Sequence, residues 1–149
     1  MKFSLFYLTF GLVPATLSAG DGASGSYRRC GVVPFTSDGE VWMIPSEKSG
    51  WILPKGKIES DDSDTKECAA REAREEGGFY FSQDLQYVGA FVDTVWYTGT
   101  VTTKGEPTDK KNANRGPAKH FKSEVARKHL EGMKKKASML TALDTVLGR

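Results

Sequence analysis

The chain has 149 residues, of which 38% are hydrophobic and 27% charged, and this suits one soluble globular domain with its own core. Its two cysteines, Cys30 and Cys68, are too few for a disulfide framework. We expect both to pack as small hydrophobic residues, and a single bridge in an oxidising compartment is the alternative. After the N-terminus no segment is long and apolar enough for a membrane helix.

The formal net charge of +2 hides a strong asymmetry along the chain. Residues 59–76 carry eight acids and three bases, whereas residues 104–149 carry twelve bases and five acids. An acidic patch beside a basic field is expected where a metal ion and a polyanion meet at one site. The alternative is a solvated surface with a basic tail.

Residues 1–19 have the layout of a secretory signal peptide. Lys2 precedes an apolar run that is short for a bilayer span, and small residues then lead to a predicted cleavage site around Ser18 to Gly20. Residues 20–26 are rich in glycine and serine, which predicts a flexible spacer. The expected domain is therefore 27–149, and the chain that remains after Lys2 is removed with the signal peptide has a net charge of 20 − 19 = +1. A buried N-terminal strand is the alternative for the apolar run.

Strand and helix patterns alternate along the predicted domain. β-branched and aromatic runs bounded by turn residues predict strands at 27–35, 40–45, 86–93 and 95–103, whereas 51–53 is a short apolar run that Pro54-Lys55-Gly56 ends. A helix begins at Ser63 or Asp64, where Asp64 and Glu67 form a capping-box pattern, and ends at Gly77-Gly78. After a polar, basic loop at 104–119, helices are predicted at 123–129 and 134–147, the second with Met139, Leu140, Leu143, Val146 and Leu147 facing inward. This order indicates an α/β (α+β) fold with a sheet sandwiched between helices.

Three glutamates near the end of the central helix carry the chemistry. Glu72, Glu75 and Glu76 stand at i, i+3 and i+4 and so share one helical face, where like charges repel unless a cation lies between them. A carboxylate cluster without histidine or cysteine suits Mg²⁺ or Mn²⁺ and suits zinc poorly. Such a site favours attack by a metal-activated water on a phosphorus atom. A charged surface helix is the alternative.

Gly56 followed by Arg71-Glu72-x-x-Glu75-Glu76-x-Gly78 resembles the Nudix box, the signature of the Nudix hydrolase family. The resemblance implies a Nudix fold with a mixed sheet between helices, Glu72, Glu75 and Glu76 as metal-binding and water-activating carboxylates, and the Gly56 carbonyl as a further ligand. Arg71 would pair with acids of the preceding loop, with Glu59 as the first candidate. Asp62 stands where the family has a glutamate, one residue further than usual from the Arg-Glu pair, which leaves its role open.

Within the family, the chain is similar to the diphosphoinositol polyphosphate phosphohydrolases, most clearly in Trp51-Ile52-Leu53-Pro54-Lys55-Gly56-Lys57. It departs from them between Asp93 and Phe121, where it is shorter and lacks an arginine in 94–103. A highly phosphorylated inositol needs many cationic partners. The residues expected to bind substrate are Arg28, Arg29, Ser46, Lys48, Lys55, Lys57, Lys134, Lys135 and Lys136, with Arg115 and Lys119 as substitutes for the absent arginine.

The resemblance implies cleavage of diphosphate bonds in inositol pyrophosphates with release of phosphate. The alternative is a Nudix pyrophosphatase acting on dinucleoside polyphosphates, ADP-ribose or NADH; Tyr97 lies near the position of a base-stacking tyrosine, although core packing is its commoner use. A second alternative is a secreted binding module without catalysis. We expect a monomer whose partner is a small polyphosphate, with no requirement for nucleic acid or membrane. Export suggests the hypothesis of an effector that reaches a host cell's cytoplasm.

Overall fold

The computed structural model describes residues 27–149, so the predicted signal peptide and spacer lie outside the described residues. A mixed sheet has the strand order β3-β2-β1-β7-β6, with β4 paired to β1 and β9 paired to β2. The β1–β7 pair is parallel and the other pairs are antiparallel. Within residues 27–149, no helix combines the length and apolar character needed to cross a membrane.

The elements follow one another with short connections. The strands of the main sheet are β1 Arg29–Phe35, β2 Val41–Ser46, β3 Gly50–Ile52, β4 Lys55–Lys57, β6 Gln86–Phe91, β7 Thr94–Thr100 and β9 Lys119–Phe121. A separate two-stranded ribbon pairs β5 Phe79–Tyr80 with β8 Thr103–Lys104. The helices are α1 Thr65–Gly77, α2 Lys110–Ala113, α3 Ser123–Leu130 and α4 Ala137–Val146, with a 3₁₀ turn, η1, at Lys134–Lys136.

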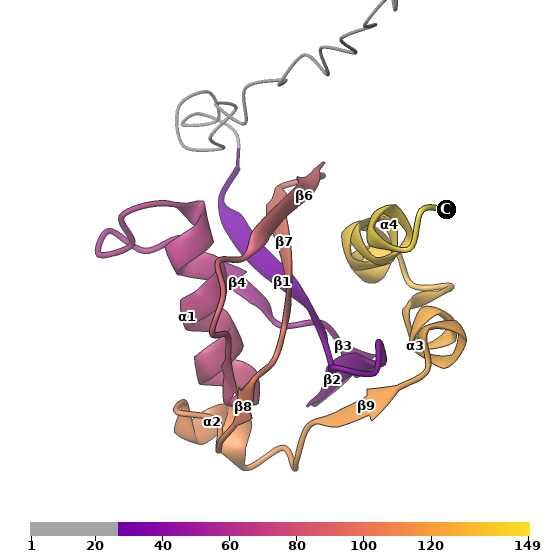
Figure 1. Ribbon diagram of the computed structural model, residues 1–149, viewed down its shortest axis with the longest axis horizontal. Coiled ribbons are helices and arrows are strands. Elements are labelled where there is room, and N and C mark those ends of the chain that lie inside the picture. Colours follow the sequence, from indigo (N-terminus) through magenta and orange to yellow (C-terminus); the bar gives the residue numbers. More distant parts are fainter. Residues whose placement is uncertain (1–26) are drawn as a thin grey trace, which may run out of the picture.

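Helices cover both faces of the sheet, as the sequence predicted, with α1 on one side and α3 and α4 on the other (Figure 1). Alternation along β1 explains the two cores, because successive side chains point to opposite faces. Cys30 and Val32 face α1 and pack with Ala69 and Ala73, whereas Val33 faces the other layer. That second core joins the sheet to α3 and α4 through residues that include Met43, Leu53, Trp96, Leu130, Met139 and Leu143.

Two features of β1 that look unfavourable in sequence are accommodated by its neighbours. A Cβ on Gly31 would lie 2.6 Å from the ring of Trp96, so the glycine makes room for the indole. Pro34 falls between the end of the β4 pairing at Gly31 and the start of the β2 pairing at Phe35. Its missing N–H therefore leaves no gap on that side of the strand.

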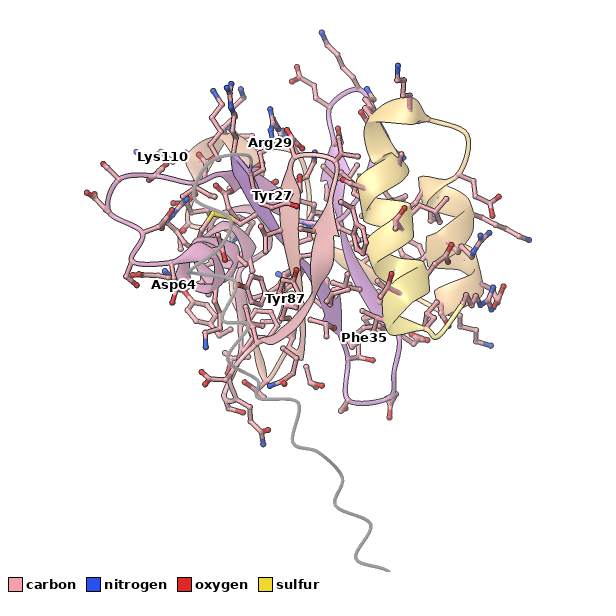
Figure 2. The ribbon with its side chains drawn as sticks, turned by 90° about the horizontal axis from the view of Figure 1, so that it is seen from above. Tyr27, Arg29, Phe35, Asp64, Tyr87 and Lys110 are labelled. Carbon is pink, nitrogen blue, oxygen red and sulfur yellow. A yellow bond between two sulfur atoms is a disulfide. The ribbon has the colours of Figure 1, made fainter. Side chains whose placement is uncertain are left out.

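The prediction for the cysteines was wrong. Cys30 on β1 and Cys68 on α1 form a disulfide with a Cα–Cα distance of 6.0 Å, and the bond is drawn in yellow beside α1 in Figure 2. Both residues are fully buried. They meet because β1 turns Cys30 toward the helix layer and α1 turns Cys68 toward the sheet, a juxtaposition produced by tertiary packing.

The region after β7 also differs from prediction. The expected loop at 104–119 contains β8, α2 and the start of β9. The expected helix over 134–147 begins as the separate turn η1, and α4 proper starts at Ala137. The inward positions Met139 and Leu143 are confirmed, and Leu140, Val146 and Leu147 are partly buried against the same core.

Candidate active site

Helix α1 has a capping residue at each end, and both are recognisable in the sequence. At the N-terminus Asp64 Oδ1 accepts a hydrogen bond of 2.7 Å from the Glu67 N–H, which confirms the predicted cap. At the C-terminus Gly78 adopts φ 67°, a left-handed conformation that favours glycine, and its N–H donates to Arg74 O at 3.0 Å.

A second segment closes the C-terminal end of α1. Three backbone amides of the loop after β8 donate to carbonyls there: Gly105 to Gly78 O at 2.7 Å, Thr108 to Arg74 O at 3.3 Å and Asp109 to Glu75 O at 3.2 Å. The last carbonyls of a helix lack intrahelical partners. The loop therefore satisfies them and is itself fixed beside the glutamates.

Arg71 is the electrostatic centre of the acidic face. Its guanidinium donates to both carboxylate oxygens of Asp62, from Nε and Nη2, at 2.9 Å each, and Nη2 also donates to Lys57 O at 2.9 Å. Glu59, the first candidate partner in sequence, lies farther away at 3.7 Å. The bidentate pair with Arg71 lowers the pKa of Asp62 and raises that of Arg71. Asp62 therefore holds the acidic loop against α1.

Glu72 and Glu76 crowd together beneath the Gly56 turn. A Cβ on Gly56 would lie 2.1 Å from the Glu72 carboxyl carbon, so this backbone position must be glycine. Glu76 Oε1 accepts the Lys55 N–H at 3.1 Å, and its carboxyl group lies close enough to that of Glu72 for each to affect the pKa of the other. Burial, and secondly the charge of Glu72, raise the pKa of Glu76 to about 8, and burial also raises the pKa of Glu72.

Glu75 takes a different direction. Arg71 Nη1 donates to Glu72 Oε1 at 3.0 Å and to Glu75 Oε2 at 3.1 Å, so the guanidinium lies between these two carboxylates. Within residues 27–149, no three acidic, histidine or cysteine side chains converge closely enough to form a metal-binding group in this arrangement. The structure thus brings Glu72, Glu76 and Gly56 together and turns Glu75 toward Arg71.

The donor set fits a hard divalent cation. Its members are carboxylate oxygens beside a glycine backbone. Burial raises the pKa of both Glu72 and Glu76, and the neighbouring charge of Glu72 raises that of Glu76 further. A divalent cation relieves that repulsion and favours the ionised carboxylates. Glu72, Glu75 and Glu76, with Gly56, are the residues that would hold Mg²⁺ or Mn²⁺.

Cationic side chains influence the charge at Glu76 and Lys55. The pKa of Lys55 is lowered chiefly by burial and secondly by the positive charge of Arg29, so these two side chains lie near each other. The charge of Arg115 acts to lower the pKa of Glu76, against the effect of burial. Arg29 is anchored by Asp93, whose Oδ2 lies 3.4 Å from the guanidinium.

The other expected substrate residues are spread over several elements. Lys57 follows the Gly56 turn on β4, Arg28 precedes β1, Ser46 ends β2, and Lys48 lies in the β2–β3 turn. Lys119 is on β9 with its Nζ 5.7 Å above the Trp51 ring, and therefore replaces the absent arginine less directly than Arg115. Lys134 and Lys135 are exposed on η1. The structure does not bring these residues into contact with the glutamates.

Lys136 was wrongly assigned to the substrate site. Its side chain is 3% exposed, and its Nζ donates to Trp51 O at 3.1 Å and to His129 O at 2.6 Å. The sequence Lys134-Lys135-Lys136 contains three equivalent cations, and only the packing of η1 against β3 and α3 turns one of them inward.

Tyr97 belongs to the core. It is 5% exposed, and its hydroxyl is 2.7 Å from Thr65 Oγ1. A buried ring cannot stack on a substrate base, so this feature does not favour a dinucleoside substrate. A hollow of about 450 Å³ lies along another side of α1, lined by residues that include Lys66, Ala70, Arg74 and Phe81, and none of the glutamates that carry the chemistry lines it.

Two functional contributions were missed in sequence. Asp93 binds the start of β1, because its carbonyl accepts the N–H groups of Arg28 and Arg29, both at 3.1 Å, as well as pairing with the Arg29 side chain. The Lys55 main-chain amide, rather than its side chain alone, contacts Glu76. Nothing in the sequence around Asp93 indicates that it anchors the start of β1. The Leu-Pro-x-Gly turn, by contrast, is a signal that could have placed the Lys55 amide beside Glu76.

The fold and the glutamate helix together define a phosphoanhydride-hydrolase type of architecture, and the comparisons identify the family. A family model described as the NUDIX domain matches residues 26–135, so the chain belongs to the Nudix family. A search of curated proteins found no match.

Solved structures with a similar fold agree with this membership. A NUDIX hydrolase from Nitrosomonas europaea is 16% identical with a TM-score of 0.62, covering 82% of this chain and 89% of its own. The Bacillus subtilis pyrophosphohydrolase BsRppH is 17% identical with a TM-score of 0.59, covering 86% and 85%. A C. elegans Ap4A hydrolase is 16% identical with a TM-score of 0.58, covering 81% and 96%.

Proposed function

We propose that this protein is a divalent-metal-dependent hydrolase that cleaves diphosphate bonds in inositol pyrophosphates and releases phosphate. The observation that carries the proposal is the meeting of two opposite fields at Glu76: the carboxylates of α1 on one side and Arg29, Lys55 and Arg115 on the other. Such a site suits a metal ion and a densely charged phosphate group together.

The residues divide the work between holding the metal and orienting the substrate. Glu72, Glu75 and Glu76 would hold the ion, which would supply charge neutralisation at the phosphoryl oxygens and an activated water. Glu76 also accepts the Lys55 N–H, which fixes its carboxylate beneath the Gly56 turn, where it could take a proton from an attacking water. Arg71 and Asp62 fix the helix and loop around these groups.

The choice of substrate rests on charge. Each phosphate of an inositol pyrophosphate requires a cationic or hydrogen-bonding partner, and the chain offers Arg28, Lys48 and Lys57 beyond the three cations near Glu76. Dinucleoside polyphosphates, ADP-ribose and NADH are the alternative substrates. The fold is similar to that of a C. elegans Ap4A hydrolase, but the buried Tyr97 offers no stacking surface for a base.

A phosphate-release assay tests the proposal. Purified protein with Mg²⁺ would be compared on a diphosphoinositol polyphosphate, diadenosine tetraphosphate, ADP-ribose and NADH, and the first should be hydrolysed with the highest kcat/KM. Equal or faster turnover of ADP-ribose overturns the choice of substrate. Glu75→Gln with Glu76→Gln should abolish turnover while circular dichroism still shows the folded protein; a biological effect that persists in this double variant would instead favour a binding module.

We also propose that the protein is exported and acts as a monomer, with a host cell's cytoplasm as the place of action if the producer is a microbe. The buried Cys30–Cys68 disulfide supports export, because disulfides persist in oxidising compartments. Detection of the processed protein inside host cytoplasm is the expected result. Retention of all the protein in the cell wall or extracellular space argues against this destination.

A further inference from the structure

Lys136 is a buried cation that the hydrolytic chemistry does not use. It is 3% exposed, and none of the carboxylates of residues 27–149 forms an ion pair with it. Burying an ammonium group is costly unless its protons are satisfied. Here two backbone carbonyls, Trp51 O at 3.1 Å and His129 O at 2.6 Å, accept those protons.

The two acceptors belong to different elements. His129 lies in the last turn of α3, where carbonyls lack intrahelical partners and the helix dipole favours a positive charge. Trp51 lies in β3, which is at the edge of the sheet and pairs with β2 only. The Lys136 ammonium therefore ties η1, α3 and the edge strand together at one point.

The edge strand leads directly into the active site. Four residues after Trp51, the Lys55 N–H donates to Glu76 Oε1, and Gly56 then lies against the Glu72 carboxyl group. The intervening Leu53 is fully buried in the core formed with α3 and α4, and Pro54 O accepts the Val32 N–H at 3.1 Å. Four residues span at most about 14 Å of chain. A displacement of Trp51 is thus passed on through a short, packed segment.

We infer that Lys136 is a positioning residue for the turn formed by Leu53–Gly56, and that through this turn it sets the placement of Glu72 and Glu76. The sheet and α1 hold the turn on one side, through Val32, Glu72 and Glu76. Lys136 holds the strand that precedes it on the other side, from the α3 and α4 layer. This inference rests on the proposed function, since it assigns a residue to that site.

Lys136→Met tests the role, because methionine keeps an unbranched side chain and removes the donors. Lys128→Met is the matched control: it removes the same charge from an exposed position of α3, next to His129. Small errors in placing reacting groups lower catalytic rates by large factors. We expect Lys136→Met to lower kcat at least about tenfold with KM within about twofold of wild type, and Mn²⁺ binding measured by calorimetry to weaken about tenfold.

Amide hydrogen exchange in metal-free protein provides a readout independent of activity. In Lys136→Met the Lys55 amide should exchange at least about tenfold faster, whereas the amide of Trp96 at the centre of the sheet should keep its wild-type rate. Equal acceleration at both amides would indicate general loss of stability and overturn the inference. Mn²⁺ affinity and kcat equal to those of Lys128→Met would also overturn it.

The two proposals fail in different ways. If the wild-type protein hydrolyses no tested substrate, the proposed function falls, while Mn²⁺ affinity and Lys55 exchange still decide the role of Lys136. If Lys136→Met does not fold, Lys136→Gln takes its place, because its amide keeps two N–H donors without the charge. In that case, Mn²⁺ binding by Lys136→Gln weaker than that of Lys128→Met, with faster exchange of the Lys55 amide, supports positioning. Mn²⁺ binding and Lys55 exchange equal to those of Lys128→Met overturn it.

Discussion

Removal of the Cys30–Cys68 disulfide should destabilise the protein substantially. The two residues are 38 positions apart, and the entropy lost by closing a loop of that length in the unfolded chain is about 13 cal/mol/K. At 25 °C this corresponds to about 4 kcal/mol of stabilisation. Because typical domains are stable by about 5–15 kcal/mol, the bond would supply a large share of the total. The bond links β1 directly to α1, the helix that carries the glutamates.

The variant to measure is Cys30→Ala with Cys68→Ala, since alanine avoids burying a hydroxyl group in a fully buried site. Urea unfolding followed by circular dichroism should show a free energy of unfolding lower by about 3–4 kcal/mol than that of the oxidised wild type. Dithiothreitol should lower the wild-type value similarly and leave the double variant unchanged, because the chain has only these two cysteines. A loss below about 1 kcal/mol, or an equal effect of reductant on both proteins, would refute the reasoning.

Three further predictions concern the acidic face. The pKa of Glu76 rises from 4.5 to about 8 on folding, so the folded state binds the proton more tightly than the unfolded state. As the pH is raised from 4.5 to 8, the metal-free protein should therefore lose up to about 1.4 kcal/mol of stability per pH unit. Thermal unfolding in EDTA at a series of pH values should show this slope, and the slope should be smaller in Glu76→Gln. Asp62→Asn breaks the bidentate pair with Arg71 and should cost about 2–3 kcal/mol in urea unfolding; a cost near zero would show that the loop is held by other contacts. Gly56→Ala places a Cβ against the Glu72 carboxyl group and should lower hydrolysis and Mn²⁺ binding by more than about tenfold. The control is Gly105→Ala, which should resemble wild type because the nearest atom to its Cβ would be 3.6 Å away. Equal behaviour of the two variants contradicts the steric conflict between a Cβ at position 56 and Glu72.

Local signals in sequence predicted the catalytic helix well. The Asp64 cap, the Gly78 terminator and the shared face of the glutamates all depend on residues within one helix or its ends, where short-range spacing determines geometry. The layered fold was also predictable, because alternating strand patterns on either side of a helix leave few ways to bury their apolar faces.

The misplaced features depend on contacts between distant segments. Cys30 and Cys68 are each ordinary within their own element, and they meet only through the packing of β1 on α1. Lys136 is chemically identical to its neighbours Lys134 and Lys135, and its two acceptors lie 85 and 7 residues away. Such placements follow from tertiary packing, and neither hydrophobic periodicity nor helix-capping residues indicate them.

The loop that follows β8 has two parts: one is hydrogen-bonded to the end of α1, and the other has no such attachment to that helix end. Its amides at Gly105, Thr108 and Asp109 clasp the end of α1, whereas α2 and Arg115 lie beyond the last of these attachments. Residues inserted or deleted between 110 and 118 would therefore change the surface around Arg115 while the helix end stays closed. Under the proposed function, such changes can alter which polyphosphate the protein accepts while the fold around the glutamates stays the same.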